Sequence, residues 1–146
     1  MTPSNIFVLL PTYNRRRILP RTIASVFAQD EKDFELIIVD DCSIDDTGTY
    51  LASLNDPRIR VLRPPNNLGT AGARNLGLEA SQADIVALLD DDDVYLEGCL
   101  SAPPAVFTHE PAVVVTLSSS SKLILSARAS PCGGKLLSTS AVSARG

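Results

Sequence analysis

Four consecutive aspartates, Asp90 to Asp93, carry the clearest chemical signal in this 146-residue chain. They directly follow an apolar run, Ile85 to Leu89, that is typical of a buried strand. Neighbouring carboxylates repel one another, so their pKa values rise unless a cation compensates the charge. Mg²⁺ and Mn²⁺ prefer carboxylate oxygens and commonly combine one or two of them with substrate phosphates. The aspartate run therefore predicts a divalent-metal site, and the alternative is a solvated acidic turn.

Two other polar segments follow apolar runs in the same way. Residues 12–14 (Thr-Tyr-Asn) come after the run 6–10, which a proline stops, and Asp40 and Asp41 come after the run 34–39. A carboxylate at such a strand end can accept hydrogen bonds from a nucleotide base or ribose. A loop acid or a helix-capping acid is the alternative interpretation of the aspartate pair.

The surrounding pattern predicts the elements that would position these groups. Apolar runs alternate with amphipathic stretches, which favours an α/β fold with right-handed crossovers and a mostly parallel sheet. The expected strands are residues 6–10, 34–39, 59–62 and 85–89, and the expected helices are residues 18–29, a segment through 50–54, and 71–81. Ligands of such sheets bind outside the carboxyl ends of the strands, where all three polar segments would lie.

Residues 67–75 form a glycine-containing loop that enters the last expected helix. Its backbone N–H groups and Arg74 could face a phosphate. The segment lacks the spacing of a Walker loop or of a dinucleotide-binding loop. Gly72 and Gly77 weaken the helix prediction, since glycines also mark ordinary turns.

Together these segments resemble the nucleotide-sugar half of a family 2 glycosyltransferase with the GT-A fold, a Rossmann-like, mostly parallel sheet flanked by helices. The resemblance covers about residues 5–100, and its segments occur in the order of the family. Those segments are residues 8–14, 33–43, 56–61, 67–69 with 73–75, and 89–93. Cys42 is a departure, because the family commonly has glycine at that position.

The resemblance implies transfer of a sugar from a nucleoside-diphosphate donor to an acceptor hydroxyl, with inversion and with Mn²⁺ or Mg²⁺ as cofactor. Pro11 and Tyr13 would line the pocket of the nucleotide base, Asp41 would form a hydrogen bond with that base, and Arg74 would lie near the diphosphate. Asp90, Asp91 and Asp92 would form the DXD motif, with Asp90 and Asp92 holding the metal and Asp91 facing the nucleotide. The acceptor would be a glycan or a lipid-linked saccharide, which also implies peripheral association with a membrane.

The catalytic base of the family lies downstream of the DXD motif, where this chain changes character. All 17 acidic residues lie between Asp30 and Glu110, whereas residues 111–146 hold four basic residues and many serines. We therefore interpret residues 1–110 as a nucleotide-sugar-binding GT-A subdomain and residues 111–146 as an atypical serine-rich tail. No catalytic base is assigned. The fold is expected to be incomplete at the C-terminus, as in a truncated or frame-shifted product or a chain that needs a partner.

Two alternative functions stay open. The first is a nucleotide-sugar-binding fragment that transfers nothing. The second is a response-regulator receiver with Asp90 as phosphoacceptor and Lys135 as its lysine, although this leaves the first 33 residues outside the domain. The net charge of −4 argues against binding to nucleic acid. The absence of a long apolar run or a signal peptide favours a cytoplasmic protein.

Overall fold

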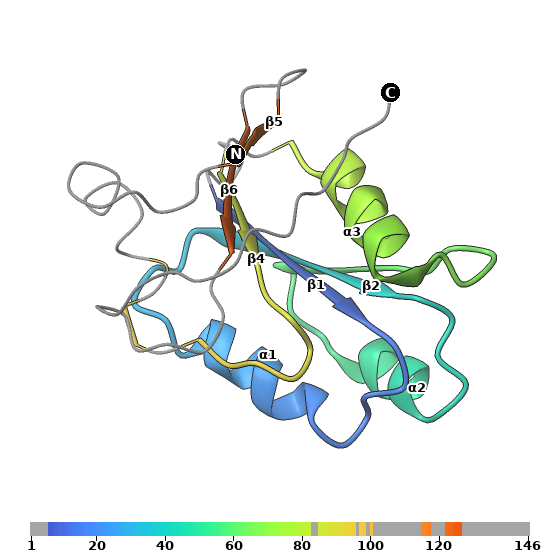
Figure 1. The fold of residues 1–146 in the computed structure, drawn as a ribbon. Coiled ribbons are helices and arrows are strands. Elements are labelled where there is room, and N and C mark those ends of the chain that lie inside the picture. Colours follow the sequence, from blue (N-terminus) through green and yellow to red (C-terminus); the bar gives the residue numbers. More distant parts are fainter. Residues whose placement is uncertain are drawn as a thin grey trace.

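The computed structural model describes residues 6–82, 85–95, 97, 98, 100, 115–117 and 122–126. Within them the chain forms one six-stranded sheet in the order β3-β2-β1-β4-β6-β5 (Figure 1). The strands are β1 (Ile6–Thr12), β2 (Phe34–Asp40), β3 (Ile59–Leu62), β4 (Ile85–Leu88), β5 (Val115–Leu117) and β6 (Lys122–Ser126). The helices are α1 (Leu19–Phe27), α2 (Thr47–Ser53) and α3 (Gly69–Ala80). None of these helices is long and apolar enough to cross a membrane.

The sheet is parallel except at one edge. β1 pairs in parallel with both β2 and β4, and β6 continues the parallel order on the other side of β4. Only β5 runs antiparallel to its neighbour, β6. This arrangement confirms the mostly parallel α/β sheet predicted from the sequence. Because β1 and α1 belong to this sheet and its core, the receiver alternative, which excludes residues 1–33, does not fit the structure.

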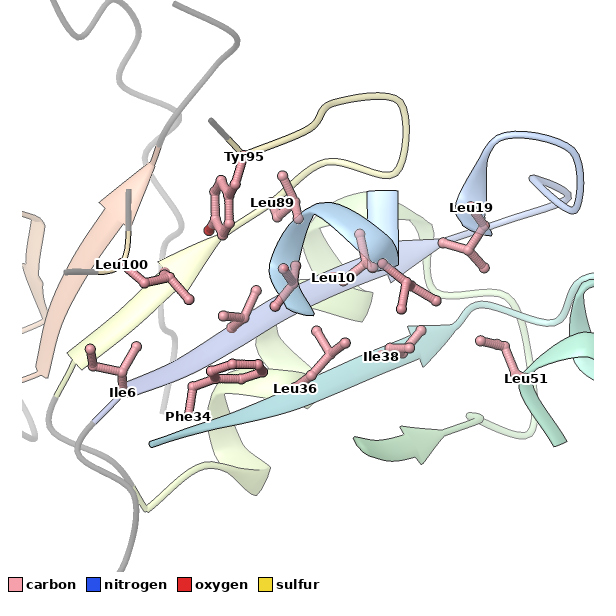
Figure 2. Packing of buried hydrophobic residues seen from close by; sticks show 14 residues of the cluster. Ile6, Leu10, Leu19, Phe34, Leu36, Ile38, Leu51, Leu89, Tyr95 and Leu100 are labelled. Atoms are coloured by element: carbon pink, nitrogen blue, oxygen red, sulfur yellow. The ribbon is translucent and has the colours of Figure 1, made fainter. Parts of the chain in front are cut away.

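Both faces of the sheet are covered, which explains the continuous apolar runs of the central strands. Every residue of β1 is buried, and its side chains alternate between two hydrophobic clusters. α1 and α2 cover one face, where Leu10, Leu36 and Leu19 pack together in the cluster of Figure 2. α3 covers the other face, where Ala73 and its neighbours pack on the odd-numbered side chains of β1 (Figure 1).

Pro11 does not end the first strand, contrary to the sequence prediction. β1 continues to Thr12, which pairs with Asp40 of β2. The carbonyl of Leu9 points toward β4, where it accepts the N–H of Leu89 at 3.0 Å. Pro11 lies two residues further along β1, so its backbone nitrogen also faces the side of β4. Pairing with β4, however, stops at Leu9. The missing N–H of Pro11 therefore costs no ladder hydrogen bond.

Gly77, one of the two glycines that weakened the helix prediction, has a packing role in α3. A Cβ atom on Gly77 would lie 2.1 Å from Cδ1 of Leu9 in β1. Both residues are buried, so the absence of a side chain at Gly77 lets α3 approach the sheet closely. The helix extends from Gly69 to Ala80, two residues earlier than expected at its start.

Replacing Gly77 with alanine is expected to lower the free energy of unfolding by about 1–3 kcal/mol, since the added methyl overpacks the contact with Leu9. Urea denaturation measures the change. Glu79→Ala is the matched control, because Glu79 is exposed on the same helix and its replacement should change stability by less than about 0.5 kcal/mol. Equal stability of Gly77→Ala and the unmodified chain would contradict the packing argument.

The other expected elements are present with shifted ends. α1 is shorter than the predicted 18–29, and β4 ends at Leu88 instead of 89. Beyond residue 110, the sheet gains two strands that were not among the expected four, β5 at Val115–Leu117 and β6 at Lys122–Ser126. Most of the serine-rich tail and Lys135 lie outside the described residues.

An aromatic cluster lies at the amino ends of the strands. The guanidinium carbon of Arg58 lies 4.6 Å from the ring centroid of Phe27 and 5.0 Å from that of Phe34. The two rings meet edge to face with centroids 5.6 Å apart. Asp56 fixes the arginine through an ion pair of 2.9 Å between its Oδ2 and Nη2 of Arg58. This cluster joins the end of α1 to the starts of β2 and β3.

Candidate donor site

The carboxyl ends of β1, β2 and β4 and the first turns of α3 surround a cavity of about 480 Å³. All seven residues to which the sequence assigned nucleotide or metal roles line it. They are Pro11, Tyr13, Asp41, Arg74, Asp90, Asp91 and Asp92. Four lining residues were not assigned a role from sequence, namely Thr12, Arg15, Thr70 and Ala73, although each lies in or beside a segment that the sequence singled out. The cavity lies between β1 and its neighbours, at the edge where parallel sheets bind ligands.

The aspartate run divides its side chains between two tasks. Carboxylate oxygens of Asp90, Asp92 and Asp93 all lie within 4.8 Å of one another. The backbone turns here, since the N–H of Asp93 donates to the carbonyl of Asp90 at 3.1 Å. Asp91 points elsewhere. The acidic cluster thus contains the predicted Asp90 and Asp92 and adds Asp93, which sequence reasoning left without a role.

Arg74 connects α3 to this cluster. Its Nη2 donates to Oδ1 of Asp90 at 2.5 Å, and its side chain is 15% exposed. Nε of Arg74 is buried and has no acceptor among the described residues. A guanidinium has five N–H donors, so Arg74 keeps donor capacity for an anionic group in the cavity while it pairs with Asp90.

Asp91 ties the end of β1 to the loop after β4. Its Oδ2 accepts hydrogen bonds from Oγ1 of Thr12 at 3.1 Å and from the N–H of Tyr13 at 3.4 Å. Arg15 lies 3.6 Å from its other oxygen. Burial raises the pKa of Asp91 above that of an ordinary aspartate, against the opposing effect of the Thr12 hydrogen bond and the Arg15 charge. Tyr13, whose backbone N–H is held by Asp91, is 45% exposed and lines the cavity.

Asp40 and Asp41, adjacent in sequence, have different partners. Asp40 is buried and pairs with Arg63, whose Nη1 lies 2.6 Å from Oδ2 of Asp40. Asp41 lines the cavity, and its carboxylate accepts the N–H groups of Leu68 at 2.7 Å and Gly69 at 2.9 Å. Of these two aspartates, only Asp41 therefore lines the cavity.

Asn14 joins the loops after β1 and β2 but does not line the cavity. Its N–H donates to Oγ of Ser43 at 2.9 Å, and its Oδ1 accepts the N–H of Ile44 at 2.8 Å. Cys42, where the family commonly has glycine, adopts a φ of 67°, in the left-handed region that favours glycine. Its Sγ donates to the carbonyl of Pro64 at 3.2 Å. The departure from glycine thus keeps the backbone conformation that glycine would favour.

The charge balance of the cavity suits a cation. Four carboxylates and two guanidinium groups line it, so its formal charge is −2. Three carboxylates of the neighbouring cluster offer oxygen atoms close enough to share one ion, and oxygen is the donor that Mg²⁺ and Mn²⁺ prefer. The donor set present therefore fits a hard divalent cation with room for substrate phosphates.

Comparison with known proteins gives consistent results. A GalNAc(5)-diNAcBac-PP-undecaprenol beta-1,3-glucosyltransferase of Campylobacter jejuni is 41% identical over 97 residues, covering 64% of this chain and 31% of the relative. S. aureus TarS 1–349, solved in complex with UDP-GlcNAc, is 28% identical with a TM-score of 0.65 and covers 72% of this chain and 32% of TarS.

The mannosyltransferase PcManGT from Pyrobaculum calidifontis, solved with GDP-Man and Mn²⁺, has a TM-score of 0.64 at 22% identity and supports the fold. Its aligned region covers 75% of this chain and 34% of PcManGT. The chain thus spans about a third of the length of the relatives that it matches. The family model described as Glycosyl transferase family 2 matches residues 7–123. The chain belongs to glycosyl transferase family 2, and its sheet has the GT-A fold.

Proposed function

We propose that this chain carries the donor site of a glycosyltransferase that moves a sugar from a nucleoside diphosphate to an acceptor hydroxyl. The observation that carries the proposal is the cavity at the carboxyl edge of the sheet, which brings together all seven residues that the sequence assigned to nucleotide or metal. The nucleotide of TarS makes UDP the first donor nucleotide to test. The name of the C. jejuni relative favours a glycan or lipid-linked acceptor, and with it a cytoplasmic chain that contacts a membrane surface.

The lining residues that the sequence singled out then have definite tasks. Pro11 and Tyr13 form the wall against which the base packs, and the buried carboxylate of Asp41 accepts a hydrogen bond from the base. Asp91, fixed by Thr12 and Tyr13, faces the nucleotide. The remaining N–H donors of Arg74 bind the diphosphate. These contacts orient the donor before any bond breaks.

The acidic cluster completes the donor site. Asp90 and Asp92, together with Asp93, would hold a divalent cation, Mn²⁺ or Mg²⁺. When bound, the cation neutralises the negative charge that develops on the departing nucleoside diphosphate. Arg74 adds a second positive charge on the same side. Direct attack by the acceptor hydroxyl on the anomeric carbon, opposite this leaving group, inverts the configuration.

A second candidate is a fragment that binds a nucleotide sugar without transferring it. Inversion needs a base that takes the proton of the acceptor hydroxyl. In the described part of the chain, the lining carboxylates Asp41, Asp90 and Asp91 accept hydrogen bonds from the protein, and Asp92 belongs to the acidic cluster. This observation favours a base supplied from outside the described residues.

Titration with UDP, GDP and their sugar conjugates, with and without Mn²⁺, tests both candidates. We expect binding of at least one nucleotide to tighten at least about tenfold when Mn²⁺ is present, because a cation held by the carboxylates would offset the negative charge of the phosphates. Release of nucleoside diphosphate in the presence of an acceptor supports the transferase, and binding without turnover supports the fragment. Failure of every nucleotide to bind in the presence of Mn²⁺ would contradict the donor site itself.

A further inference from the structure

The start of α3 is held by a carboxylate from another strand. Oδ1 of Asp41 accepts the N–H of Leu68 at 2.7 Å, and Oδ2 accepts the N–H of Gly69 at 2.9 Å. The backbone carbonyl of Asp41 accepts Nδ2 of Asn67 at 2.9 Å. Asp41 is 4% exposed, whereas the three donor residues lie at the surface, so these hydrogen bonds join a buried acceptor to an exposed loop.

The start of α3 has one local side-chain acceptor, because Oδ1 of Asn67 accepts the N–H of Gly69 at 3.1 Å. Leu68 occupies the N-cap position and has no side-chain acceptor, and the first turn of the helix contains no acidic residue. The first N–H groups of a helix lack partners within it and carry a partial positive charge. Asp41, 27 residues before Leu68, accepts the N–H of Leu68, shares the N–H of Gly69 with Asn67, and adds the complementary negative charge.

The anchored end of α3 is also the end that faces the cavity. Thr70, Ala73 and Arg74 lie in its first two turns and line the cavity, and Arg74 reaches Asp90 from there. At its other end, α3 is fixed by the close contact of Gly77 with Leu9. The hydrogen bonds of Asp41 therefore fix the half of the helix on which the position of Arg74 depends.

We propose that Asp41 is a positioning residue that holds the N-terminal turn of α3 and so places Arg74 for the diphosphate, in addition to facing the base. The role of Arg74 in diphosphate binding rests on the proposed donor site, whereas the hydrogen bonds that anchor α3 are present in the ligand-free chain. A carboxylate oxygen can accept more than one hydrogen bond, so the anchor and a base contact are compatible.

The test compares Asp41→Asn with the unmodified chain in two measurements. The first is amide hydrogen exchange of the ligand-free protein. In asparagine one of the two carboxylate oxygens is replaced by an NH₂ donor, so the N–H groups of Leu68 and Gly69 can no longer bind one oxygen each. We expect exchange to accelerate about tenfold or more at Leu68 and by less at Gly69, whose N–H keeps Oδ1 of Asn67 as an acceptor. Amides of β1 serve as the internal reference, because they report any global loss of stability.

The second measurement uses pyrophosphate with Mn²⁺, a probe that has no base. If Asp41 positions Arg74, Asp41→Asn should weaken the binding of pyrophosphate as well as that of UDP, and the loss should be larger for UDP because only UDP also loses the base contact. Loss of UDP affinity with unchanged pyrophosphate affinity, or unchanged exchange at Leu68 and Gly69, would overturn the anchor. If the unmodified chain binds neither pyrophosphate nor UDP, the proposed donor site is wrong. The exchange rates at Leu68 and Gly69 still test whether Asp41 anchors α3.

Two further variants keep the test decisive. Asp56 also accepts a backbone N–H, from Arg58 at 2.9 Å, but at the opposite edge of the sheet, so Asp56→Asn should leave exchange at Leu68 and Gly69 unchanged. If Asp41→Asn does not fold, Asn67→Ala is the second variant, because it removes the Oδ1 acceptor of Gly69 and the donor to the carbonyl of Asp41 but leaves the carboxylate in place. If the carboxylate is the anchor, exchange at Leu68 should stay slow in Asn67→Ala, and exchange that accelerates at Leu68 as much as at Gly69 overturns it.

Discussion

Replacing Asp92 with alanine is expected to weaken Mn²⁺-dependent binding of the nucleotide by at least about 100-fold. Losing even an outer partner of a metal ligand costs about 10- to 100-fold in metal affinity, and loss of a direct ligand should cost no less. Asp92 is exposed at the surface of the acidic cluster, so its removal leaves no buried charge without a partner. Calorimetric titration of UDP at fixed Mn²⁺ measures the effect.

Asp46→Ala is the matched control, since it removes the same charge from an exposed aspartate that makes no capping hydrogen bond to α2 and does not line the cavity. Its nucleotide affinity should equal that of the unmodified chain. Asp93→Ala extends the series, because its carboxylate lies in the cluster without lining the cavity. Retention of metal-dependent binding in Asp92→Ala would remove Asp92 from the DXD assignment.

The second large effect is expected at Arg74. Hydrogen bonds to charged groups contribute about 1.5–3 kcal/mol each, so Arg74→Ala should weaken the binding of UDP by roughly 10- to 150-fold. Arg74→Lys keeps the charge but not the fork of donors, and it should recover part of the loss. The readout is the dissociation constant of UDP at saturating Mn²⁺.

The affinity for Mn²⁺ without nucleotide distinguishes loss of the diphosphate contact from general damage to the site. Arg74 competes for Oδ1 of Asp90 in the ligand-free chain, so Arg74→Ala should bind Mn²⁺ no more weakly than the unmodified chain. Arg60→Ala is the control, because Arg60 is exposed and donates to the carbonyl of Ala80, away from the cavity. Unchanged UDP affinity in Arg74→Ala would rule out the diphosphate contact.

The order of the elements could be predicted from sequence because each central strand is buried on both faces. Such strands appear as continuous apolar runs, and the polar residues that follow them must lie at one edge. The ends of the elements were less predictable. Pro11 looks like a strand end in sequence, and only the shorter pairing of β4 explains why β1 continues through it.

Most residues that line the cavity could be singled out from the sequence, but the partners of their side chains could not. Four aspartates in a row do not reveal that Asp91 turns toward Thr12 while Asp93 joins the cluster, since the turn at Asp90 to Asp93 decides both. The hydrogen bonds that the N–H groups of Leu68 and Gly69 donate to Asp41 link positions far apart in the chain. Such pairings depend on tertiary packing, which residue types and spacing do not encode locally.

The aromatic cluster around Arg58 has a consequence for protein engineering. β2 has seven residues and spans about 20 Å, with Phe34 at one end and the cavity beyond the other. Substitutions far apart without shared partners have nearly additive effects. Variants that strengthen the contacts of Arg58 can therefore raise the melting temperature of a chain whose donor site is already impaired by mutation. Such a stabilised background would let variants of the cavity be compared without loss of folded protein.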